Sequence, residues 1–118
     1  MKVLLVDDDH GSREILAGFL RKKEFEVLEA GTGEEALDMV KQKQPRALLL
    51  DWRLPGISGL EVLDALSQGG HRPERVCMLT GMDGIEEIKA MKQAGADHIF
   101  HKPYDLLEIL TLLNDLKG

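Results

Sequence analysis

Acidic side chains directly follow two apolar segments of the chain. Asp7 and Asp8 come after the apolar residues 3–6, and Asp51 comes after the apolar residues 47–50. Carboxylates that meet at one point repel one another, and a divalent cation relieves that repulsion. Ligands that are all oxygen favour Mg²⁺ or another hard ion, and Mg²⁺ commonly binds one or two carboxylates together with a phosphate. These residues therefore predict a Mg²⁺-assisted phosphoryl site.

Two polar residues at the ends of later apolar segments complete a set for phosphoryl transfer. Asp51 ends a rigid apolar run, so its carboxylate can act as a nucleophile. Lys102 would add a positive charge beside the phosphoryl group, and Thr80 would add a hydroxyl donor. We therefore expect Asp51, Thr80 and Lys102 to carry the chemistry.

The elements that must bring these residues together follow an alternating pattern. Short apolar runs, each expected to be a strand, alternate with amphipathic segments at residues 3–6, 26–28, 47–50, 76–79 and 99–100. This alternation predicts a parallel sheet in a doubly wound (βα)₅ fold. The first, third and fourth runs are apolar at nearly every position, as expected of central strands, whereas the second and fifth resemble edge strands. Right-handed crossovers place all strand carboxyl ends at one edge of the sheet, where the polar groups converge.

Helix starts are indicated by acceptor residues that precede a glutamate by three positions. The pairs Thr32/Glu35, Ser58/Glu61 and Asp83/Glu86 each predict a capping box. The last helix, expected from about residue 104 to 116, carries more leucine and isoleucine than one buried stripe needs. Part of its apolar surface is therefore expected to stay exposed.

Composition limits the class of protein. A chain of 118 residues is the size of one domain, expected at residues 1–118, with 43% hydrophobic and 31% charged residues. The net charge of -6 argues against nucleic acid or an anionic membrane as a partner, so proteins are expected instead. Cys77, the single cysteine, lies in an apolar run and is expected to be a buried thiol. The start of the chain is unlike a signal peptide and no run reaches transmembrane length, which predicts a cytoplasmic location.

Five short motifs occur in chain order at the predicted strand ends. They are V-D-D-D at 6–9, L-D-W-R-L-P-G-I-S-G at 50–59, L-T-G at 79–81, G-A-D at 95–97 and K-P-Y at 102–104. Together they resemble the response-regulator receiver family of two-component signal transduction, over the whole chain. The resemblance implies a flavodoxin-like fold with strand order 2-1-3-4-5, which agrees with the pattern of apolar runs.

The resemblance also implies a role for each matching residue. Asp51 resembles the phosphoacceptor, Asp7 and Asp8 the acidic metal pair, and Arg53 the residue whose backbone carbonyl binds the metal, with Asp9 outside the metal site. Thr80 resembles the switch hydroxyl, Lys102 the phosphate-contacting lysine, and Pro103 the proline that often follows a cis bond. The implied cofactor is Mg²⁺. The chain would be a signalling domain that catalyses only its own phosphorylation and dephosphorylation.

The same resemblance implies partners and one departure from the family pattern. A sensor histidine kinase or a histidine phosphotransfer protein would donate the phosphoryl group, and an output domain or protein would receive the signal. Phosphorylation would change the surface of the fourth helix, fifth strand and fifth helix, with a weak homodimer through the last helix as a further expectation. Most relatives have Tyr or Phe three residues before the lysine, where this chain has Ile99, so Thr80 and Ile99 together would form its switch.

Two other classes of function remain open at this point. An aspartate-nucleophile phosphatase of the haloacid-dehalogenase type would use Asp7 and Asp9, but Gly11 stands where its threonine is expected. A receiver-like scaffold that works without phosphorylation would typically lack an acid or the lysine, and this chain keeps them. The four histidines show no metal-ligand spacing and receive no role.

Overall fold

The computed structural model describes residues 1–117, and the expected domain of residues 1–118 therefore extends to Gly118, which lies outside the described residues. Strands and helices alternate along the chain as predicted. The strands are β1 (Lys2–Val6), β2 (Glu26–Ala30), β3 (Ala47–Asp51), β4 (Arg75–Thr80) and β5 (His98–His101). The helices are α1 (His10–Lys22), α2 (Gly33–Lys43), α3 (Gly59–Gly69), α4 (Ile85–Gln93) and α5 (Leu106–Lys117).

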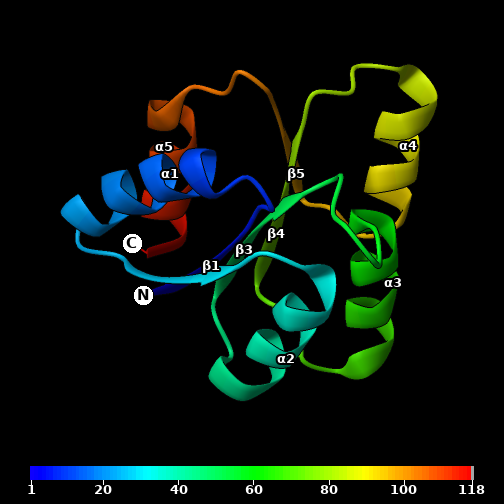
Figure 1. Cartoon of the computed structure of the whole chain (residues 1–118), viewed down its shortest axis with the longest axis horizontal. Helices are drawn as coiled ribbons and strands as arrows, with labels where there is room; N and C mark the ends of the chain where they lie inside the picture. Colours follow the sequence, from blue (N-terminus) through cyan, green and yellow to red (C-terminus); the bar gives the residue numbers. More distant parts are fainter. Residues whose placement is uncertain (118) are drawn as a thin grey trace.

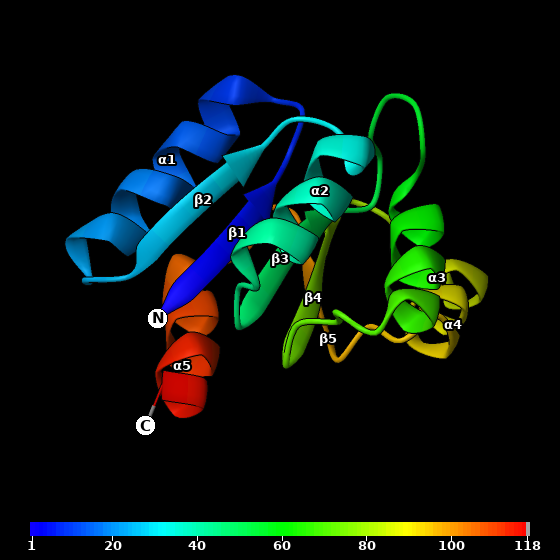
Figure 2. The ribbon, with the colours of Figure 1, turned by 90° about the horizontal axis from the view of Figure 1, so that it is seen from below.

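The five strands form one parallel sheet in the order β2-β1-β3-β4-β5, which confirms the predicted fold class and strand order. β2 and β5 lie at the two edges, and Figure 2 shows the strands side by side in this order. Helices α1 and α5 cover one face of the sheet, while α2, α3 and α4 cover the other (Figure 1). The carboxyl ends of β1, β3, β4 and β5 therefore open onto one edge of the sheet.

Two apolar cores hold the three layers together, one on each face of the sheet. The buried side chains of β1 and β3 alternate between the cores, since successive residues of a strand face opposite sides. Cys77 on β4 belongs to the core under α1 and α5 and is fully buried, as predicted. Burial raises the pKa of its thiol to about 12, so the sulfur is an inert packing group.

The helix starts agree with the sequence in part. Ser58 and Glu61 form the predicted capping box at α3, and the Thr32 hydroxyl caps α2 by accepting from the backbone N–H of Glu35. The Glu35 carboxylate, however, accepts from the N–H of Gly31, one residue before the cap. Two of the three predicted pairs therefore do cap a helix, and one of them is a complete capping box.

The predicted capping box at Asp83 and Glu86 is wrong. The chain enters α4 through Gly84, which has extended backbone angles and is the N-cap, so Asp83 lies one residue too early. Glu86 is then the second helical residue rather than the third. The last helix also begins later than predicted, at Leu106, because the Asp105 carboxylate accepts the N–H of Leu107 and so marks the start of the helix.

The surface of α5 keeps exposed apolar side chains, as expected from its composition. Ile109 and Leu113 are buried against the sheet, whereas Leu107 is 63% exposed. Among residues 1–117, no helix combines the length and the apolar character that crossing a membrane requires.

Candidate functional site

Asp51 is the last residue of β3, a strand in which every residue is buried. Its side chain is held by two donors: Oδ1 accepts from the backbone N–H of Arg53 at 3.2 Å, and Oδ2 accepts from Nζ of Lys102 at 3.0 Å. The residue is 6% exposed, which leaves the carboxylate in contact with the adjoining cavity. A carboxylate fixed by a central strand in this way is well placed to act as a nucleophile.

Asp7 follows β1 and is 1% exposed. Its Oδ1 accepts from the backbone N–H of Asp9 at 2.9 Å, but its Oδ2 has no hydrogen-bond partner among residues 1–117. Burial raises the pKa of the Asp7 carboxyl, and the nearby Asp51 charge raises it further, against the opposing effects of the Asp9 N–H and Lys102. A buried carboxylate oxygen without a partner is costly and is a position that a cation would satisfy.

A third carboxylate completes the acidic group that the sequence predicted. Asp8 is exposed, and one oxygen from each of Asp7, Asp8 and Asp51 lies within 4.8 Å of the others. Three carboxylates at this spacing, one with a buried unsatisfied oxygen, suit a small hard dication such as Mg²⁺. The residues present therefore fit the expected ion. Asp9 has a different task, because its carboxylate caps α1 by accepting from the N–H of Gly11.

Lys102 follows β5 and places its ammonium group between two of the acids. Its Nζ lies 3.0 Å from Oδ2 of Asp51 and 3.9 Å from Oδ2 of Asp7. Partial burial alone would lower the pKa of Lys102, but the hydrogen bond and charge of Asp51, followed by the charge of Asp7, outweigh it and raise the pKa. The bond between Lys102 and Pro103 is cis, the isomer that the resemblance implied.

Thr80 ends β4 and is 1% exposed. Its Oγ1 accepts from the backbone N–H of Met82 at 2.9 Å, a bond that leaves the hydroxyl hydrogen available to another acceptor. On the neighbouring strand, Ile99 is half-buried opposite Met78 and packs against the core under α3 and α4. Since Met78 and Thr80 point to the same face of β4, Ile99 lies on the face toward which the Thr80 side chain projects.

A cavity of about 630 Å³ opens above these groups. It is lined by Asp8, Asp51, Trp52, Arg53, Thr80, Gly81, Met82, Asp83, Gly84, Glu87 and Lys102. The Arg53 guanidinium reaches across it, with Nη2 3.4 Å from Sδ of Met82. The contact links the loop after β3 to the loop after β4. The backbone carbonyl of Arg53 remains the expected fourth metal ligand.

One part of the site was not predicted from the sequence. Arg13 on α1 donates through Nη1 to the backbone carbonyl of Asp7 at 2.7 Å and pairs through Nε with Glu29 on β2 at 3.1 Å. The sequence signal was an arginine at the fourth residue of the helix that follows the acidic residues. Recognising it requires the positions of α1 and β2 relative to each other, which the local pattern does not contain.

Comparison with known proteins gives one consistent family. Residues 3–114 match the family described as "Response regulator receiver domain". The chain is 34% identical over 108 residues to Sporulation initiation phosphotransferase F of Bacillus subtilis, covering 92% of this chain and 86% of that protein. It is 40% identical over 117 residues to Response regulator MprA of Mycobacterium avium, covering 98% of this chain but only 50% of that protein. The chain thus spans about half the length of this second relative.

Solved structures agree with this family. A putative response regulator from Chloroflexus aurantiacus matches with a TM-score of 0.88 and 33% identity, covering 97% of this chain and 94% of that one. The chemotaxis response regulator CheY4 of Vibrio cholerae matches with a TM-score of 0.88 and 27% identity, covering 97% of this chain and 96% of that one. Together with the sheet order and the strand-end acids, these matches show that the chain belongs to the response regulator receiver domain family of two-component signalling.

Proposed function

We propose that this receiver domain is a Mg²⁺-dependent switch that accepts a phosphoryl group on Asp51. The main support is the environment of the Asp51 carboxylate. Asp51 is the last residue of a buried strand, and its carboxylate faces a cavity of about 630 Å³ and accepts a hydrogen bond from Lys102. The donor would be a phosphohistidine of a sensor histidine kinase or a histidine phosphotransfer protein. Such an encounter would take place in the cytoplasm.

The transfer step needs a nucleophile, charge neutralisation and a donor geometry that the cavity admits. An oxygen of Asp51 forms the new bond to phosphorus, while the phosphorus–nitrogen bond of the donor breaks and its electron pair returns to the imidazole. Bound Mg²⁺, held by Asp7, Asp8, Asp51 and the Arg53 carbonyl, would neutralise charge on the phosphoryl oxygens. Nζ of Lys102 already lies 3.0 Å from Oδ2 of Asp51, and it would pair with the phosphoryl group once that group is attached to Asp51.

The switch follows from the contacts that only the phosphorylated state offers. The Thr80 hydroxyl has a hydrogen available, and a phosphoryl oxygen on Asp51 would be its acceptor. A charge-assisted hydrogen bond contributes about 1.5–3 kcal/mol, which corresponds to a population shift of roughly tenfold or more. Because Thr80 leads into α4 and Lys102 into α5, the changed surface would be that of α4, β5 and α5, with Ile99 filling the space that Thr80 leaves.

Two further features support a long-lived phosphorylated state and a protein-binding surface on α5. Arg53 and Met82 meet at 3.4 Å across the cavity and offer neither a carboxylate nor an amide side chain to position an attacking water. We therefore expect slow loss of the phosphoryl group. The exposed Leu107 on α5 would contribute to a contact with an output domain or to a weak phosphorylation-dependent homodimer.

The test is to incubate the chain with a small acyl-phosphate donor, with Mg²⁺ or with a chelator, and to follow intact mass and donor consumption. The proposal predicts about one phosphoryl group per chain, only with Mg²⁺, and donor consumption that slows once the chain is labelled. Absence of labelling at millimolar Mg²⁺ would overturn the proposal in favour of a phosphorylation-independent scaffold. Rapid turnover of phosphate esters without accumulated label would instead indicate a phosphatase.

A further inference from the structure

The backbone of Asp7 is held from both sides by groups outside the acidic cluster. Its N–H donates to the carbonyl of Ala30 on β2 at 3.1 Å, and its carbonyl accepts from Nη1 of Arg13 on α1 at 2.7 Å. That carbonyl belongs to the same peptide unit as the N–H of Asp8. One guanidinium therefore fixes the peptide plane from which both acids of the pair project.

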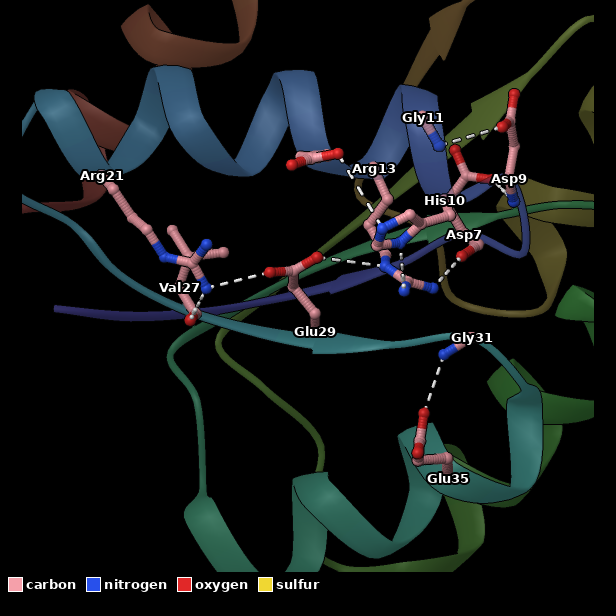
Figure 3. A network of polar contacts seen from close by, with 11 residues as sticks. Asp7, Asp9, His10, Gly11, Arg13, Arg21, Val27, Glu29, Gly31 and Glu35 are labelled. Atoms are coloured by element: carbon pink, nitrogen blue, oxygen red, sulfur yellow. Dashed lines mark hydrogen bonds and ion pairs between the residues drawn. The ribbon is translucent and has the colours of Figure 1, made fainter.

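Arg13 is itself held firmly. Its side chain is only 17% exposed, and its Nε donates to Oε1 of Glu29 at 3.1 Å while Nη2 contacts Nδ1 of His10 at 3.2 Å. The other oxygen of Glu29 pairs with Arg21 at 3.0 Å, and Arg21 also donates to the Val27 carbonyl at 2.9 Å. Figure 3 shows this chain of contacts from Asp7 through Arg13 and Glu29 to Arg21. The Arg13 guanidinium thus links β2, through Glu29, to the loop that carries Asp7 and Asp8.

Gly31 leaves room for this arrangement. A Cβ atom at residue 31 would lie 3.1 Å from Nη1 of Arg13, the same nitrogen that donates to Asp7. Such a contact is tighter than ordinary packing, so the guanidinium would have to move. The glycine is outside the left-handed backbone region, and an alanine there would therefore press on the guanidinium without straining the main chain.

We propose that Arg13 is a positioning residue that orients the Asp7–Asp8 peptide, and so sets the Mg²⁺ affinity of the domain. The inference rests on the Mg²⁺ site of the proposed function. The direction of the change in Mg²⁺ affinity on removing Arg13 distinguishes positioning from simple electrostatics. Removing a cation near a cation site should strengthen Mg²⁺ binding through Coulomb's law alone, whereas loss of positioning should weaken it.

The experiment measures Mg²⁺ binding by calorimetry in the full chain, with thermal unfolding in a chelator as the readout of fold. Arg13→Met should weaken Mg²⁺ binding by about tenfold, the low end of the range for residues that orient metal ligands. Arg13→Lys should recover part of the affinity, because one ammonium group cannot donate to both Asp7 and Glu29 in the manner of a planar fork. Arg21→Met is the matched control, since it removes a cation from Glu29 without touching Asp7, and its affinity should stay that of wild type.

Gly31→Ala tests the same nitrogen without changing any charge, and it decides the question if Arg13→Met fails to fold. It should weaken Mg²⁺ binding in the same direction and by a smaller factor. In labelling with an acyl-phosphate donor, both variants should need more Mg²⁺ for half-maximal rate yet approach the wild-type rate at saturating Mg²⁺. A structural role alone would lower the unfolding temperature and leave these Mg²⁺ dependences unchanged.

The outcomes separate the inference from the function on which it depends. If wild type binds no Mg²⁺, the proposed metal site fails and the inference fails with it. If wild type binds Mg²⁺ and folded Arg13→Met binds it as tightly or more tightly, the positioning role alone is wrong. Unchanged binding in Gly31→Ala would contradict the role in the same way.

Discussion

Replacing Asp7 by asparagine should stabilise the fold when no divalent cation is present. The carboxylate is 1% exposed, and its Oδ2 has no hydrogen-bond partner among residues 1–117. An asparagine keeps the oxygen that accepts from the N–H of Asp9. It replaces the unpaired oxygen with an amide that can donate to the neighbouring Asp51 carboxylate. The substitution therefore removes a buried charge and retains the hydrogen bond that the side chain already makes.

The expected gain in the free energy of unfolding comes from the one contribution that is not offset by another. Asp7 is attracted to Lys102 at 3.9 Å and repelled by Asp51, and these two charge interactions have opposite signs. The remaining term is the desolvation of an unsatisfied polar group, about 1–3 kcal/mol. For a chain of 118 residues, 1 kcal/mol corresponds to about 4 °C in unfolding temperature. We expect Asp7→Asn to unfold roughly 4–12 °C above wild type.

The assay is thermal and urea unfolding of both proteins at pH 7 in a chelator. Asp8→Asn is the control, because Asp8 is exposed and its replacement should change stability by no more than about 0.5 kcal/mol. Mg²⁺ at ten times its dissociation constant should stabilise wild type by about 1.4 kcal/mol and Asp7→Asn by less, which narrows the difference. If Asp7→Asn were no more stable than wild type in the chelator, the unpaired Asp7 carboxylate oxygen would not destabilise the fold, and this reasoning would be wrong.

Three further predictions concern lifetime, pH and the switch. Arg53→Ala and Met82→Ala should each lose the phosphoryl group faster than wild type by intact mass over time, and equal rates would refute the shielding role of their contact. Partial burial alone would raise the pKa of Asp97, but the hydrogen bonds from Arg72 and from the Val76 N–H outweigh it and lower the pKa. Asp97 should therefore stabilise the fold above its unfolded pKa of about 3.9 and lose that contribution as pH falls through its lower folded pKa, so Asp97→Asn should be destabilised at pH 7 and approach wild type in acid unfolding curves. Beryllofluoride should alter hydrogen exchange across residues 83–116, whereas changes limited to the loops after β1 and β3 would show that the signal leaves by another face.

The sequence predicted the sheet and the acidic edge because both depend on local patterns. Apolar runs identify strands, and a parallel sheet places every strand end at the same edge, so Asp7, Asp51, Thr80 and Lys102 could be brought together without coordinates. The structure places these four side chains at that edge. The start of α4 was harder, since Asp83 and Gly84 are both plausible caps and the choice depends on how the loop leaves β4.

Contacts between distant elements could not be predicted from the same patterns. Arg13 contacts both Asp7 and Glu29 because α1 packs beside β2 in one particular register. A shift of α1 by one helical turn along its axis would separate these groups. The Arg53–Met82 contact depends likewise on two loop conformations. Periodicity shows which face of a helix is buried, but it does not fix the height at which a side chain meets the next element.

Phosphorylation of Asp51 is tested by comparing wild type with Asp51→Asn by intact mass after incubation with Mg²⁺ and an acyl-phosphate donor. Lys102 should keep an oxygen partner in the variant, and the chain should remain folded, so any difference reports on the nucleophile. Wild type should gain the mass of one phosphoryl group, and Asp51→Asn should gain none. An equal gain in Asp51→Asn would contradict phosphorylation of Asp51, because the phosphoryl group would then be carried by a residue other than Asp51.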